Sequence, residues 1–168
     1  MPWNGSKTWV AGEVVGATAM NTYVRDNLNY LLARPLAFFN TVLGVTWTYT
    51  STSYVPVATS TDLAIVTQTG RLMVGARVIA KASVDMIFAL RINIDSGLST
   101  HYLSEFFRLP HADHVTPLPI SPTILTGLAT GTQHTLRMEV AVNASTPGTL
   151  SIFNLNVGRA FQFWAMEV

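Results

Sequence analysis

Cysteine is absent from this sequence of 168 residues. The chain can therefore form no disulfide framework, no thiolate zinc site and no cysteine nucleophile, which excludes several classes of enzyme and of small secreted scaffold. Whatever stabilises the folded chain must come from the packing of its side chains and from hydrogen bonds.

Charged residues are also scarce. Asp, Glu, Lys and Arg make up 11% of the chain and give a net charge of +1, whereas about 25% is usual for soluble proteins. Without a basic stripe or a polybasic cluster, the sequence predicts neither nucleic acid nor a membrane surface as a partner. A surface with so little charge, in a chain that is 49% hydrophobic, indicates that the protein is a subunit of an assembly.

Long apolar runs and recognisable catalytic motifs are missing as well. No run approaches the roughly 20 residues needed to span a bilayer, and the opening residues MPWNGSKTW lack the pattern of a secretory signal. We therefore expect a soluble protein that is made in the cytosol. The sequence contains no G-x-S-x-G, no H-E-x-x-H and no glycine-rich phosphate loop, so we predict no enzymatic activity and no cofactor.

What the sequence does contain begins with an amphipathic helix, predicted from Thr18 to the residue before Pro35. Thr18 is suited to cap the helix, and Pro35 closes it. Its residues repeat at intervals of four, three and four, which is the seam of a short coiled coil, at Met20, Val24, Asn27 and Leu31. A buried Asn27 would fix the register and the number of helices. The alternative is a helix that packs on the protein's own core through Tyr23, Leu28 and Leu32.

The remainder predicts an all-β domain. Runs rich in Val, Ile, Thr and aromatic residues alternate with turn signals such as Thr69-Gly70. Eight strands are expected at about residues 44–50, 53–58, 62–67, 71–82, 83–94, 132–143, 149–157 and 161–168. This spacing predicts an antiparallel β-sandwich of the jelly-roll type. The expected division is an N-terminal attachment segment, residues 1–40, and a sandwich domain, residues 41–168.

The last predicted strand, FQFWAMEV, is apolar on both faces. Such a strand lies between two layers or at a contact between subunits. Together with the low charge, it predicts an oligomer with Phe163 or Trp164 in the subunit contact.

Residues 99–126 are predicted to form a long loop, because they include four of the eight prolines. Loops of this length are usually functional or part of an interface. Tyr102, Phe106 and Phe107 are candidates for stacking on a saccharide, although aromatic residues more often fill a core. The high apolar content of this segment favours burial against a neighbouring subunit over a solvated receptor-binding tip.

The same segment brings potential metal ligands together at His111, Asp113 and His114. Two imidazoles and a carboxylate suit zinc or nickel, but a site would need a further fixed ligand or the three copies that a threefold axis supplies. Polar residues flanked by prolines are more often exposed loop, so we predict no metal site.

The opening stretch resembles a known family. The string T-W-x-x-G-E-V-V, followed by M-N-T-Y-V-R-D-N-L-x-x-L, resembles the N-terminal segment that recurs in virion structural proteins of tailed bacteriophages. From residue 70 onward, strings such as V-D-M-I-F-A-L-R-I-N-I-D-S-G are similar in pattern to the small trimeric jelly rolls of phage fibres and decoration proteins, which are shaped like tumour-necrosis-factor and complement heads. The matching positions in the opening stretch are Trp9, Gly12, Glu13, Asn21, Arg25, Asp26, Asn27 and Leu31.

This resemblance implies a homotrimeric virion component with a mechanical function, such as reinforcement, anchoring or display. Its partners would be other copies of itself and a capsid or tail protein. The alternative is a tail-associated adhesin that recognises a host surface glycan, and an enzyme acting on cell-wall sugar has the weakest support. The expected attachment and oligomerisation residues are Trp9, Glu13, Met20, Asn21, Val24, Arg25, Asn27, Leu31, Phe163 and Trp164.

Overall fold

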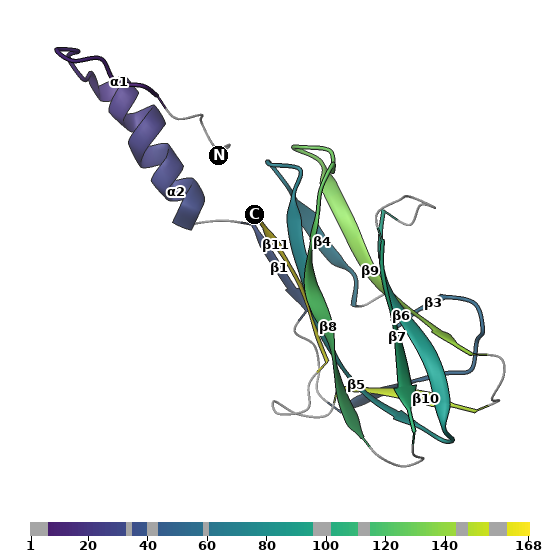
Figure 1. Ribbon diagram of the computed structural model, residues 1–168. Coiled ribbons are helices and arrows are strands. Elements are labelled where there is room, and N and C mark those ends of the chain that lie inside the picture. Colours follow the sequence, from purple (N-terminus) through teal and green to yellow (C-terminus); the bar gives the residue numbers. More distant parts are fainter. Residues whose placement is uncertain are drawn as a thin grey trace.

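The computed structural model describes residues 7–32, 35–39, 44–58, 61–95, 102–110, 115–143, 148–154 and 161–168. The predicted fold class is confirmed: a helical segment precedes two antiparallel sheets that pack face to face as a β-sandwich (Figure 1). No helix within the described ranges is long and apolar enough to cross a bilayer.

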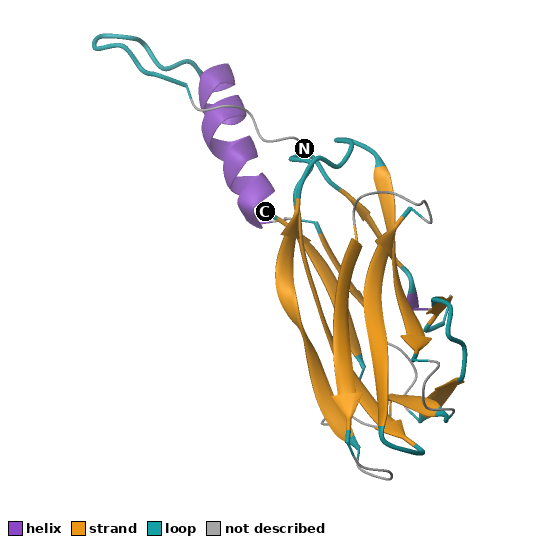
Figure 2. Ribbon diagram, turned by 45° about the vertical axis from the view of Figure 1, so that its right-hand side comes forward, coloured by secondary structure: helices purple, strands orange, loops and turns teal. Residues whose placement is uncertain are grey.

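The helical segment consists of α1 (Ala17–Met20), the π-helical turn η1 (Asn21–Arg25) and α2 (Asp26–Leu32). It begins just before Thr18, and its N-cap is Gly16 without a side-chain cap, so the predicted capping role of Thr18 is wrong. In both views the segment extends away from the sandwich (Figure 1, Figure 2). In the structure the helix therefore does not cover the protein's own core, as the alternative prediction had it.

One sheet, here called sheet A, is built around the long strand β5. One edge of β5 pairs with β11 along its first half and with β10 at its end, whereas its other edge pairs with β8. β1 then pairs with β11, and β2 pairs with β10. The strands of sheet A are β1 (Leu36–Phe39), β2 (Val45–Tyr49), β5 (Leu72–Ala82), β8 (Thr116–Leu125), β10 (Leu150–Asn154) and β11 (Gln162–Glu167).

The other sheet, sheet B, is ordered β3-β9-β6-β7, with β4 also paired to β9. The chain passes from one sheet to the other between β2 and β3, β4 and β5, β5 and β6, β7 and β8, β8 and β9, and β9 and β10, which is the connectivity of a jelly roll. The strands of sheet B are β3 (Val55–Pro56), β4 (Leu63–Val66), β6 (Met86–Ile94), β7 (Tyr102–Leu109) and β9 (Gln133–Val142).

The hydrophobic core lies between the two sheets. It follows the alternation of inward and outward side chains, so that Leu136, Met138 and Val140 of β9 are fully buried. Phe161 makes edge-to-face contacts with Phe39 and Trp47, at 5.4 and 5.7 Å between ring centroids. These contacts fix the first strands of the chain to the last one.

The predicted domain boundary is wrong by several residues. β1 lies inside residues 1–40 yet pairs with β11, and Phe39 is 5% exposed within the core. Pro35 also belongs to the sandwich edge, because its carbonyl oxygen accepts a hydrogen bond from Glu167 N at 3.1 Å. The sandwich therefore begins with β1.

The predicted long loop over residues 99–126 is also wrong, because this stretch includes β7 and β8. Prolines are compatible with β8 because it is an edge strand. Pro117 and Pro119 are two residues apart, so their nitrogen atoms lie on the same edge of β8, and because they carry no N–H they fit the edge that faces away from β5. Ser121 N points the same way and donates to Glu105 Oε1 at 3.1 Å, which links the edges of the two sheets.

Candidate functional site

The turn before the helix is held closed by its own side chains. Lys7 forms an ion pair with Glu13 and lies over the ring of Trp9, 4.2 Å from its centroid. Val10 and Glu13 exchange hydrogen bonds, from Glu13 N to the Val10 carbonyl at 3.0 Å and from Val10 N to Glu13 Oε2 at 3.3 Å. The hydrogen bond from Lys7 holds the pKa of Glu13 below its usual value. Gly12 has a φ of 85°, which explains why glycine occupies this turn.

The helical segment leaves apolar side chains uncovered. Met20 and Val24 are 46% and 38% exposed, while Asn27 is buried and its Nδ2 donates to the Tyr23 carbonyl at 3.2 Å. Asn21 is exposed, Arg25 pairs with Asp26, and the side chain of Leu31 lies outside the described part. The coiled-coil seam stays a prediction, and its described apolar positions are partly exposed.

The outer face of sheet A carries a row of apolar side chains that crosses four strands. The register aligns Leu36 of β1 with Met166 of β11, Met166 with Met73 of β5, and Met73 with Ile124 of β8. Leu36 and Ile124 are 64% and 47% exposed, and the two methionines are half-buried. We call these four residues the apolar row.

Beside the apolar row, Phe38 of β1 pairs with Trp164 of β11, which in turn pairs with Gly75 of β5. Phe38 is 50% exposed and Trp164 is half-buried. The indole ring of Trp164 lies over Gly75, where an added Cβ would approach its Cζ2 to 2.5 Å. Glycine at position 75 thus lets the indole lie flat on the sheet and extend the apolar surface.

The structure separates the two residues that were expected at a subunit contact. Phe163 is fully buried in the core of its own subunit, so its assignment to an intersubunit contact is wrong. Trp164, its neighbour in sequence, faces outward from sheet A. The alternation of β11 explains the difference, because successive side chains point to opposite faces of a strand.

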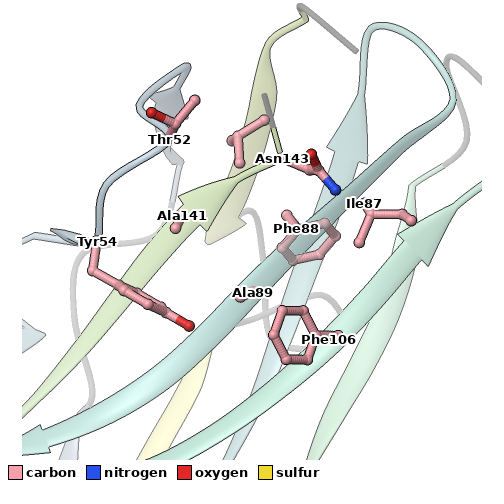
Figure 3. Close-up of a pocket in the computed structure, with 9 residues that line it drawn as sticks. Thr52, Tyr54, Ile87, Phe88, Ala89, Phe106, Ala141 and Asn143 are labelled. Atoms are coloured by element: carbon pink, nitrogen blue, oxygen red, sulfur yellow. The ribbon is translucent and has the colours of Figure 1, made fainter. Parts of the chain in front are cut away.

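Sheet B carries a shallow depression of about 270 Å³ on its outer face (Figure 3). Ala89 of β6 is in register with Ala141 of β9 on one side and with Phe106 of β7 on the other. The two small side chains form its floor. The residues that line the depression are Thr52, Tyr54, Ile87, Phe88, Ala89, Phe106, Ala141, Val142 and Asn143.

The wall of the depression opposite Phe106 is fixed by several contacts. Tyr54 Oη lies 3.0 Å from Ser104 Oγ, and the guanidinium carbon of Arg91 lies 4.0 Å from the centroid of the Tyr54 ring. Arg91 Nε in turn donates to Glu139 Oε2 at 2.5 Å, and Glu139 is buried. The orientation of Tyr54 is therefore set before any ligand arrives.

The three aromatic residues proposed for saccharide stacking have different surroundings. Phe106 is 77% exposed at the rim of the depression. Phe107 is half-buried and stacks on Phe88 at 5.6 Å between centroids, so it packs against the core. The side chain of Tyr102 lies outside the described part. Of the three, Phe106 is available to a ligand, and its burial against a neighbouring subunit stays a prediction.

The weak metal candidates, His111, Asp113 and His114, lie outside the described residues. Within the described ranges, no three His, Asp or Glu side chains are grouped in a way that could hold a metal ion.

A buried histidine joins β6 to β9. His134 Nδ1 lies 2.8 Å from Asp95 Oδ2, and its Nε2 lies 2.9 Å from the Ala129 carbonyl oxygen. Burial of the ring opposes protonation, but the Ala129 carbonyl and the Asp95 carboxylate outweigh it and raise the pKa of His134. Asp95 is well placed for this role because its Oδ1 also accepts from Thr135 N at 2.8 Å.

We expect the free energy of unfolding to fall as the pH is raised from about 6 to about 8. Because the pKa of His134 is raised in the folded state, its protonation stabilises the fold fully below the unfolded pKa of about 6.5. This contribution is lost as the pH rises through the folded-state pKa. Urea unfolding of the wild type and of His134→Gln at both pH values measures the effect. Equal pH dependence in the two proteins would contradict this assignment.

Several residues of these surfaces were not recognised in the sequence. Leu36, Met73 and Ile124 come from three separate strands, and only the strand register aligns them. The sequence analysis did not identify Ala89 and Ala141 either. Small residues at outward-facing positions of strands that otherwise carry bulky side chains can indicate a depression, and this pattern could have pointed to them.

Comparison of the sequence with protein-family models finds no matching family, and no curated protein matches it either.

Proposed function

We propose that this chain is a structural subunit of a tailed-bacteriophage virion. It forms a homotrimer, attaches to a capsid or tail protein through its N-terminal segment, and displays the sandwich. The role is mechanical rather than catalytic.

The observation that carries this proposal is a helix that extends from the folded sandwich (Figure 2) and whose described apolar side chains are partly exposed. Residues 17–32 form a helix of marginal stability on its own, because short helices normally depend on a buried apolar face. Met20, Val24 and Leu28 have large exposed fractions, of 46%, 38% and 53%. Such a helix needs a partner outside its own subunit.

The apolar row supports other copies of the same chain as part of that partner. It begins at Leu36, four residues after the end of α2 at Leu32, so the two uncovered apolar surfaces follow one another along the chain. An assembly of three copies around the helix would bury both surfaces together. Burial of apolar surface contributes about 25 cal/mol per Å², and the four side chains of the row carry no charge that would have to be desolvated.

The resemblance of residues 8–32 to phage attachment segments supports the virion as the site of assembly. The structure gives physical roles to several of the matching positions: Gly12 adopts a positive φ, Glu13 closes the turn with Lys7, and Asn27 is buried. These positions form a folded attachment segment rather than an unstructured leader.

Deletion of residues 1–34 tests the proposal. We expect a soluble, folded sandwich that no longer joins the particle, because the deletion removes the attachment segment but keeps β1 and the Pro35 carbonyl that accepts from Glu167. Circular dichroism reports folding, and mass spectrometry of particles from phage that carry the deletion reports incorporation.

Deletion of residues 1–40 is the matched control. It also removes β1 and the buried Phe39, so the sandwich should lose about 3 to 5 kcal/mol of stability, as other truncations of core aromatics do. Normal incorporation of the shorter deletion variant into particles would overturn the proposed attachment.

A further inference from the structure

We propose that the depression on the outer face of sheet B binds a single neutral sugar ring. This inference goes beyond the mechanical role and does not depend on it, because the depression and the apolar row belong to opposite sheets. A subunit that only reinforces a particle has no need of such a site.

The shape of the depression suits a flat ring. Ala89 and Ala141 keep the floor low, while Phe106 and Tyr54 rise on either side of Ala89 (Figure 3). Its volume of about 270 Å³ lies just below the range of about 300 to 1,000 Å³ that is usual for small-molecule sites. It can hold one ring but not a long segment of polymer.

The exposure of Phe106 requires an explanation. A phenylalanine that is 77% exposed on an edge strand leaves a large apolar side chain in water, which folding alone does not favour. The C–H face of a pyranose is apolar, and it can stack on an aromatic ring while its hydroxyl groups remain at the ring's edge. Phe106 is placed to make this contact.

The rim supplies polar groups for those hydroxyls. Thr52 contributes a hydroxyl, Asn143 an amide, and Tyr54 a phenolic oxygen that keeps acceptor capacity while it contacts Ser104. The rim is also anchored: Val142 N donates to the Ser51 carbonyl at 2.8 Å. Preorganisation of this kind reduces the entropy lost on binding.

The charges select a neutral ligand. None of the nine described residues that line the depression is charged. The guanidinium group of Arg91 lies against the Tyr54 ring, and its charge is already neutralised by Glu139, whose Oε2 lies 2.5 Å from Arg91 Nε. Among these described residues an anionic sugar or a phosphate would find no free cation, whereas a neutral hexose or N-acetylhexosamine loses nothing.

The test is a titration of the full-length protein that is monitored by saturation-transfer NMR. The probes are the methyl glycosides of glucose, galactose, mannose and N-acetylglucosamine, with the methyl glycoside of N-acetylneuraminic acid as the anionic comparison. We expect at least one neutral glycoside to bind with a Kd in the millimolar range, and the anionic one not to bind. Absence of binding by all four neutral glycosides would overturn the proposal without affecting the mechanical role.

Two variants locate the site. Phe106→Ala removes the stacking surface, and Ala89→Val fills the floor, so each should weaken binding by about five- to tenfold. Phe38→Ala is the matched control, because Phe38 is also an exposed strand phenylalanine, at 50%, but lies on sheet A. It should leave the Kd unchanged.

The competing occupant of the depression is a second copy of the chain. If Phe106→Ala lowers the oligomer mass in light scattering while the affinity for the sugar stays unchanged, a neighbouring subunit covers the depression and the sugar site is refuted. Unchanged mass with weakened binding supports it.

Discussion

Replacing Phe163 by alanine is expected to lower the free energy of unfolding by about 3 to 5 kcal/mol, the usual cost of truncating a buried phenylalanine. Phe163 is fully buried between the sheets and is among the largest such side chains of the described core. This loss is a large part of the roughly 5 to 15 kcal/mol that stabilises an ordinary domain. Because the lost contacts lie inside one subunit, the folded variant should keep the oligomer mass of the wild type.

Trp164→Ala is the matched comparison, one residue away and on the opposite face. It removes a half-buried indole from the outer face of sheet A. The sandwich should therefore stay folded, while a higher protein concentration should be needed to form the trimer. Denaturant unfolding measures the first effect, and light scattering over a dilution series measures the second. Loss of the trimer in Phe163→Ala with unchanged subunit stability would contradict the assignment of Phe163 to the core, and an unchanged assembly midpoint in Trp164→Ala would contradict the assignment of Trp164 to the contact.

Introducing a charge into the apolar row should dissociate the trimer. In Ile124→Lys, an ammonium group would replace a side chain that is 47% exposed in the single subunit but buried in the proposed contact. An uncompensated charge buried in this way costs on the order of 3 to 5 kcal/mol. The midpoint concentration for assembly should therefore rise by at least about a hundredfold.

Ile87→Lys is a closely matched control. Ile87 is also a strand isoleucine and is 41% exposed, but it belongs to β6 of sheet B. This variant should assemble like the wild type in analytical ultracentrifugation. If both lysine variants remain fully trimeric, or if the wild type is itself monomeric at micromolar concentration, sheet A is not the contact face.

Sequence alone predicted the sandwich and all eight of its expected strands, because each of these strands has bulky residues flanked by turn signals. The best example is the segment from Leu72 to Ala82, whose predicted and observed bounds agree to within one residue. The missed strands lacked such signals. β8 contains three prolines within its bounds, and their compatibility with a strand depends on an edge position that the sequence does not reveal.

The candidate surfaces were less accessible to prediction than the fold. The alternation in FQFWAMEV showed two apolar faces but not which one was inward, so Phe163 and Trp164 could not be told apart. Phe106 was identified as an aromatic of interest, but its setting depends on Ala89 and Ala141, which only sheet register brings beside it. Contacts of this kind are properties of the strand pairing rather than of any local stretch of chain.

The two outward-facing prolines of β8 also limit how these molecules can associate. An exposed strand edge normally invites a strand from another molecule, and repeated additions produce an endless fibre. Pro117 and Pro119 have no N–H to offer along this edge, and the neighbouring Ser121 N–H is already engaged by Glu105. Growth by continuation of sheet A is therefore blocked at β8, whereas association through the face of the sheet can close after a fixed number of copies.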